Sequence, residues 1–184
     1  FEEDVANAIS DHYLPTGISS PVPKKPLSYA ISIIDKLDRL VGFFLINEKP
    51  TSSKDPFALR RAAIGLLRIV IENNLELKLK DLISYAVRLY VEQGVKVENN
   101  QVEKDILDFL KERMKNILKE KKIKLDIIEA AISSHIGDNY LALYKKSMTM
   151  NKNFNKDIGK DAIYSFKRAS SILDHESKKL TKES

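Results

Sequence analysis

Residues 55–74 read DPFALRRAAIGLLRIVIENN, and this stretch decides the fold class. Asp55 followed by Pro56 is typical of an N-cap and a first helical residue, so the pattern predicts a helix that begins there and runs to about Asn74. Apolar side chains lie on most sides of that helix, because successive turns carry Ala, Ile, Leu or Val on more than one face. We therefore expect it to be the central helix of an all-α protein.

The rest of the chain shows the same helical periodicity. Only 6 Gly and 6 Pro occur in 184 residues, apolar residues recur every three or four positions, and hairpin signals such as Asn-Gly or Asp-Gly are absent. A helix entered through Pro26 has an apolar stripe made of Ala30, Ile34, Leu37, Val41 and Phe44. A third helix is predicted to stop near Gly94. Later helices are predicted to start at Asn100 (with Glu103 completing a capping box), Asp126, Asp138 and about Asn155.

Composition narrows the classes of function. The chain has no Cys, which excludes disulfides, thiolate zinc sites and cysteine nucleophiles and favours a reducing cytoplasm. No apolar run reaches the roughly 18 to 20 residues that span a bilayer, so we expect no membrane partner. The acidic start, which lacks Met and falls within a helical pattern, indicates a piece of a longer protein.

The formal net charge of +5 belongs entirely to the second half of the chain. Residues 1–95 are neutral overall, and the polar, turn-rich residues 94–100 mark the change, so we predict two domains, 1–95 and 96–184. A local basic excess favours a polyanion such as RNA, although a lysine-rich solvated helix gives the same pattern. The excess is concentrated in residues 140–171, where Asp157 and Asp161 are outnumbered by Lys145, Lys146, Lys152, Lys156, Lys160, Lys167 and Arg168.

One motif near the start suggests metal chemistry. AISDHYLP at 8–15 and AISIIDKLD at 30–38 resemble the latter half of an HD-type domain, a helical metal-dependent phosphohydrolase fold. The resemblance makes His12 and Asp35 degenerate metal positions, and imidazole and carboxylate suit a divalent ion. A working site needs at least three protein ligands, and the earlier His and the His-Asp doublet precede this chain. The structural alternative is an i, i+4 pair between Asp35 and Arg39, with His12 as a hydrogen-bonded helix-end residue.

A second motif lies on the helix predicted over 55–74. Arg61, Gly65, Arg68 and Glu72 share one stripe at helical spacing. A guanidinium on such a stripe can hold a phosphate or a partner carboxylate through a two-pronged contact. An internal Arg–Glu ladder, with Gly65 letting a neighbouring helix approach, explains the same spacing.

A longer run of residues resembles a known family. DKLD at 35–38, LVGFF at 40–44, KPTSSKDPFALRRAA at 49–63 and FKRASSIL at 166–173 are similar to the β subunit of the bacterial two-subunit glycyl-tRNA synthetase. Ser52 stands where that family usually has Gly, Arg39 where it often has Thr, and Ser171 where it has Asn. The resemblance covers nearly all of the chain.

The resemblance implies a function. In that family the α subunit uses ATP to charge tRNA, while the β subunit binds tRNA and holds together a complex of two α and two β subunits. This chain would then be a non-catalytic, cytoplasmic, tRNA(Gly)-binding piece of an aminoacyl-tRNA synthetase, with no cofactor of its own. Residues 1–95 would be the later part of an HD-like domain, and residues 96–184 the first part of a helical, arginyl-synthetase-like anticodon-binding domain.

Candidate RNA-binding residues lie in both basic regions, because their cations neutralise phosphates and release counterions. They are Lys54, Arg60, Arg61, Arg68, Lys145, Lys146, Lys152, Lys167 and Arg168. Tyr140, Tyr144 or Phe154 can stack on unpaired bases, although such aromatics are more often core. Two other functions stay open, namely an HD-type phosphohydrolase with a metal at His12 and Asp35, and a structural surface that docks the α subunit.

Overall fold

The computed structural model describes residues 2–154, except Ile18 and Ile136, together with residues 156, 159, 161, 164, 165 and 168. Within these residues there are helices and no strands, which confirms the all-α prediction. The helices are α1 (Glu3–Asp11), α2 (Pro26–Leu45), α3 (Leu59–Glu72), α4 (Leu79–Glu92), α5 (Val102–Glu120), α6 (Leu125–Ser133) and α7 (Tyr140–Phe154). The helix predicted from about Asn155 falls mostly outside the described residues. A membrane-crossing helix does not occur in the described part, since no helix there is both long enough and apolar enough.

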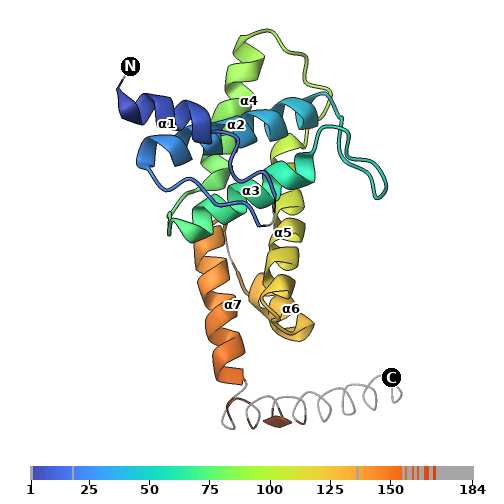
Figure 1. Ribbon diagram of the computed structural model, residues 1–184. Helices are drawn as coiled ribbons and strands as arrows, with labels where there is room; N and C mark the ends of the chain where they lie inside the picture. Colours follow the sequence, from blue (N-terminus) through green and yellow to red (C-terminus); the bar gives the residue numbers. More distant parts are fainter. Residues whose placement is uncertain are drawn as a thin grey trace, which may run out of the picture.

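Helix α3 lies at the centre of the molecule, as its sequence predicts. It packs against α2 on one side and against α5 and α7 on others, while α2 also contacts α1 and α4 (Figure 1). The helices α5 and α7 extend away from the α2–α3 pair toward α6, which packs against both of them. Eight residues of α3 are buried, namely Leu59, Ala62, Ala63, Gly65, Leu66, Leu67, Ile69 and Val70.

One hydrophobic cluster joins α2 through α7. Leu40, Leu66, Ile83, Ile106 and Met114 are completely buried in it. The cluster therefore takes residues from both sides of the boundary predicted near residue 95; the division into an HD-like and an anticodon-binding domain stays a prediction.

Three of the five residues in the apolar stripe predicted on α2 are buried. These are Leu37, Val41 and Phe44, whereas Ala30 is half-buried, Ile34 is 64% exposed and Ile33 takes the inward position instead. The inward face of α2 is set by its contacts with α3 and α4, which leave Ile34 at the edge of that face.

Two predicted helix starts are wrong by a few residues. Helix α3 begins at Leu59 instead of Pro56, because a turn ending in Ala58, at φ 53°, precedes it. The Asp55 carboxylate nevertheless accepts hydrogen bonds from the first amides of α3, at 2.8 Å from the Leu59 nitrogen and 3.0 Å from the Arg60 nitrogen.

Helix α5 begins at Val102, and Asn100 does not cap it. The side chain of the preceding residue, Asn99, makes the local contact, since its Oδ1 accepts from the Gln101 nitrogen at 3.0 Å. The inward stripe of this helix consists of Val102, Ile106, Leu110, Met114 and Ile117, which are all buried.

Candidate nucleic-acid interface

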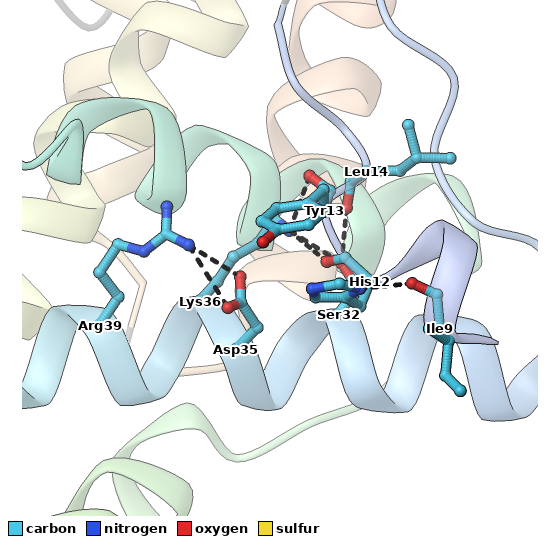
Figure 2. A network of polar contacts seen from close by, with 8 residues as sticks. All are labelled: Ile9, His12, Tyr13, Leu14, Ser32, Asp35, Lys36 and Arg39. Carbon is cyan, nitrogen blue, oxygen red and sulfur yellow. Dashed lines mark hydrogen bonds and ion pairs between the residues drawn. The ribbon is translucent and has the colours of Figure 1, made fainter.

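The two residues at degenerate HD positions contact groups of the protein itself. Asp35 forms an i, i+4 ion pair with Arg39, at 3.2 Å between Oδ2 and Nη2 (Figure 2). The His12 ring nitrogen Nδ1 lies 2.6 Å from the carbonyl oxygen of Ile9, at the end of α1. Both contacts are the ones expected if Asp35 and His12 have a structural role and do not bind a metal. Within the described residues no group of three or more His, Asp or Glu side chains is placed to hold a metal ion.

Next to Asp35 in the chain is a buried amine, that of Lys36, which sequence patterns did not single out. Lys36 is 3% exposed, and its Nζ donates to the Leu14 carbonyl and to Ser32 Oγ, each at 2.8 Å (Figure 2). Longer contacts reach the carbonyl oxygens of His12 and Tyr13. The lysine thus ties the residues after α1 to α2. Burial lowers the pKa of Lys36 to about 8, since a buried ammonium loses its hydration.

The start of α3 and the loop before it hold three of the candidate cations, Lys54, Arg60 and Arg61. Lys54 is exposed in that loop, which extends from the body of the molecule between α2 and α3 (Figure 1). Arg60 donates from Nη2 to the carbonyl oxygen of Thr51. Because the same residue also uses its backbone amide on Asp55, Arg60 connects the loop to the first turn of the helix.

A cavity of about 300 Å³ separates α3 from the loop that contains Pro15 and Gly17. Arg60, Arg61 and Arg68 line it, so the structure brings together three of the candidate cations. Its other lining residues are Pro15, Gly17, Asp55, Ala58, Ile64 and Gly65.

The contacts of the arginine stripe are those of the internal explanation, and phosphate binding by the stripe stays a prediction. Arg68 does form the internal ladder, with Nε 2.8 Å from Glu72 Oε1. Arg61 has Gly65 one turn ahead and is exposed. Gly65 also brings α2 close, because a Cβ at this position would lie 2.8 Å from the Lys36 Cε.

The lysines of α7 differ in their surroundings. Lys145 and Lys152 are exposed and lie two turns apart on one side of the helix. Lys146 donates to the carbonyl oxygen of Ser134 at 2.9 Å and so ties α7 to the end of α6. Arg168 is exposed, whereas Lys167 lies outside the described residues.

The aromatic candidates lie mainly in the core. Tyr140 is 3% exposed and donates its hydroxyl to the Leu107 carbonyl, and burial raises the pKa of that hydroxyl. Tyr144 and Phe154 are partly buried against the hydrophobic cluster. Tyr144 also lines a second cavity, of about 210 Å³, together with Arg68 and Lys121, so Arg68 stands between the two cavities.

These features describe an all-helical protein with cationic side chains on two of its helices. An all-helical scaffold carries guanidinium and ammonium groups on α3 and α7, and the aromatic side chains among them serve mainly the core. Such an arrangement can bind phosphates, because cations on rigid helices release counterions from a polyanion.

Comparison with known proteins gives the family. The family model described as glycyl-tRNA synthetase beta subunit matches residues 1–133. The glycine–tRNA ligase beta subunit of Rhodospirillum centenum is 40% identical over 177 residues, which make up 96% of this chain and 24% of that relative. That of Cereibacter sphaeroides is 39% identical over 171 residues, 93% of this chain and 24% of the relative. That of Rickettsia canadensis is 40% identical over 172 residues, 94% of this chain and 25% of the relative.

The chain belongs to the glycyl-tRNA synthetase beta subunit family. It spans about a quarter of the length of the curated relatives that it matches.

Proposed function

We propose that this chain is a tRNA-binding part of the β subunit of glycine–tRNA ligase, and that ATP-dependent glycylation of tRNA(Gly) takes place on the α subunit. Membership of the family supports the ligase assignment. In this proposal the enzyme acts in the cytoplasm as a complex of two α and two β subunits. The chain itself supplies no catalytic residue and holds no cofactor, and ATP binds the α subunit.

The observation that most supports tRNA binding is the state of two exposed cations. Arg61 on α3 and Lys145 on α7 make no ion pair or hydrogen bond with another described residue, whereas Arg68 and Lys146 are held by neighbouring groups. Exposed cations without internal partners can neutralise phosphates at little cost, because no existing contact has to break.

The test is a titration of tRNA(Gly) into the protein at two salt concentrations. We expect the observed affinity to fall steeply as salt rises, since each phosphate contact contributes a slope of roughly −0.7 to −0.9 in log–log units. Reversing Lys145 and Lys152 together to Glu should reduce that slope by about 1 to 2 and weaken binding at both salt concentrations.

A matched control carries the same charge change elsewhere. Lys96 and Lys104 are exposed in and after the connection from α4 to α5, and their reversal to Glu should leave tRNA affinity closer to the wild-type value. Binding that is insensitive to salt, or equal losses in both double variants, would argue against a tRNA surface on α7. Binding of the α subunit without binding of tRNA would favour the docking alternative.

A further inference from the structure

The arginine cavity between α3 and the loop at Pro15–Gly17 has one further cationic group, the Lys36 amine, behind its wall. The Lys36 side chain lies under Gly65, with its Cε 2.8 Å from where a Cβ of residue 65 would be placed. Three guanidinium groups thus line the cavity, and a buried amine lies beneath it.

We propose that this arginine cavity binds a phosphodiester group of the RNA backbone, with Arg61 and Arg68 as the residues that hold it. The inference rests on the proposed tRNA-binding function and names one point of contact within it. Guanidinium groups suit this ligand because their N–H donors match the spacing of phosphate oxygens.

Arg68 is already fixed in place before any ligand arrives. Its Nε donates to Glu72 and its Nη1 donates to the Gly17 carbonyl, each at 2.8 Å. Since a guanidinium carries five N–H groups, Nη2 still has donors for a ligand. A side chain held at two points loses less conformational entropy when it binds, so Arg68 is pre-organised.

Arg61 is the complementary, exposed half of the pair. Its i+4 neighbour on α3 is Gly65, which offers no carboxylate, and its i−4 neighbour is Phe57. The side chain is exposed and lines the cavity, so it can turn toward a phosphate without giving up an ion pair. Arg60 has a different task, because it donates to the Thr51 carbonyl and positions the loop.

The acidic groups nearby already have partners within the protein. Asp55 lines the cavity, but its two carboxylate oxygens accept from the amides of Leu59 and Arg60. Glu72 pairs with Arg68. In the cavity lining three arginines face one carboxylate, that of Asp55, so the charge there is positive and favours an anion.

The volume of the cavity limits the ligand. About 300 Å³ is at the lower end of the roughly 300 to 1,000 Å³ found for small-molecule sites, which suits a phosphate with part of its sugar. A phosphodiester fits the proposed function, because tRNA supplies many of them. Free phosphate and carboxylate ligands can also accept hydrogen bonds from arginine. The experiments below distinguish them from an RNA phosphodiester.

The first measurement compares three variants of the purified protein, Arg61→Gln, Arg68→Gln and the control Arg88→Gln. Arg88 pairs with Glu92 at i, i+4 on α4, as Arg68 pairs with Glu72 on α3, so the control removes the same charge and the same kind of pair. We expect the affinity for tRNA(Gly) to fall about tenfold in the Arg61 and Arg68 variants, with a salt slope reduced by about 1, and little change in the control.

The second measurement follows the Nε–H signals of Arg61 and Arg68 by NMR during three titrations. The probes are a short single-stranded RNA, the same RNA with neutral methylphosphonate linkages, and inorganic phosphate. We expect saturable shifts with the natural RNA and a loss of those shifts with the neutral backbone. Inorganic phosphate should compete only at much higher concentration.

Each other outcome counts against the inference. If tRNA binds with steep salt dependence but Arg61→Gln and Arg68→Gln match Arg88→Gln, the cavity is not the contact although the proposed function stands. If tRNA does not bind the wild-type protein, the proposed function fails first. Shifts produced by inorganic phosphate or acetate but not by RNA would assign the cavity to a different anion and overturn the RNA assignment. Thermal unfolding of the Arg61→Gln protein, compared with that of the wild type, checks that this variant at an exposed position is folded.

Discussion

At the residue scale, the protonation of Lys36 is coupled to folding. Its ammonium is buried against three carbonyl oxygens and one hydroxyl, and burial lowers its pKa from 10.5 to about 8. Between these two values the unfolded chain keeps a proton that the folded chain has released. The free energy of unfolding should therefore rise with pH in this window, by at most about 1.4 kcal/mol per pH unit.

The upper limit of that rise comes from buried tyrosines, and Tyr90 is an example. Burial and the hydrogen bond to Asp38 raise the pKa of the Tyr90 hydroxyl to about 12, so above about pH 10 the unfolded state deprotonates first and stability falls. Urea unfolding measured at several pH values between 7 and 10 checks the prediction. Lys36→Met keeps the length of the side chain and should lack the rise, and an identical slope in both proteins would show that Lys36 does not titrate there.

At the scale of the element, the start of α3 depends on one carboxylate. Asp55 accepts from the amides of Leu59 and Arg60, which would otherwise lack helical partners. Asp55→Ala should lower the free energy of unfolding by about 0.5 to 2 kcal/mol, and Asp55→Asn by less, because one acceptor oxygen remains. Chemical denaturation of the three proteins measures the difference.

The same substitution has an opposite expected effect on binding. Asp55 lines the arginine cavity, so replacing it by Ala removes a negative charge from the proposed phosphate site. The affinity for tRNA(Gly) should rise at low salt while stability falls. A parallel loss of both quantities would indicate that the helix start, and not the local charge, controls binding.

How far the sequence predicted each element depends on where its determining contact lies. The start of α2 at Pro26 and the end of α4 near Gly94, at φ 83°, follow from the backbone angles those residues prefer. The start of α3 was missed because Ala58, an ordinary residue, adopts a left-handed angle that no pattern signals. The family followed from a long run of matching residues.

The cavity and the buried lysine were beyond the reach of local patterns. Arg68 meets the Gly17 carbonyl across 51 positions, and Lys36 meets the Leu14 carbonyl across 22. Helical periodicity indicates which face an arginine shares, but not which loop packs opposite it. One signal in the sequence could have identified Lys36. It lies between Ile33 and Leu37 on an apolar face of the helix, where a solvent-exposed lysine is not expected.

At the scale of the whole molecule, one polar cluster joins the two segments on either side of residue 95. Asp105 Oδ2, on α5, accepts from Lys49 Nζ at 2.6 Å and from Asn99 Nδ2 at 2.9 Å. Asn99 is 8% exposed and also donates to the Phe44 carbonyl at the end of α2, at 3.3 Å. The backbone adds a hydrogen bond from the Glu98 nitrogen to the carbonyl oxygen of Leu45, the last residue of α2.

This cluster should couple the end of α2 to the start of α5. Lys49 and Asn99 hold the pKa of Asp105 below its usual value, so the ionised carboxylate stabilises the fold above about pH 4 and that contribution is lost as pH falls through the lowered pKa. A double-mutant cycle of Lys49→Met and Asp105→Asn near neutral pH should give a coupling of about 0.5 to 1 kcal/mol, the upper part of the range for partly exposed pairs. The more exposed Arg88–Glu92 pair, at 3.7 Å, serves as control and should give a coupling close to zero.

Amide hydrogen exchange tests whether the segments before and after residue 95 unfold as one cooperative unit. If the two segments share one cooperative unit through their common hydrophobic cluster, Asp105→Asn should lower amide protection at the end of α2 and at the start of α5 together. Loss of protection confined to α5 would instead mean that the segments open separately, as independent domains do. That result would favour the predicted division near residue 95, because a contact across a domain boundary can break without loosening the core on the far side.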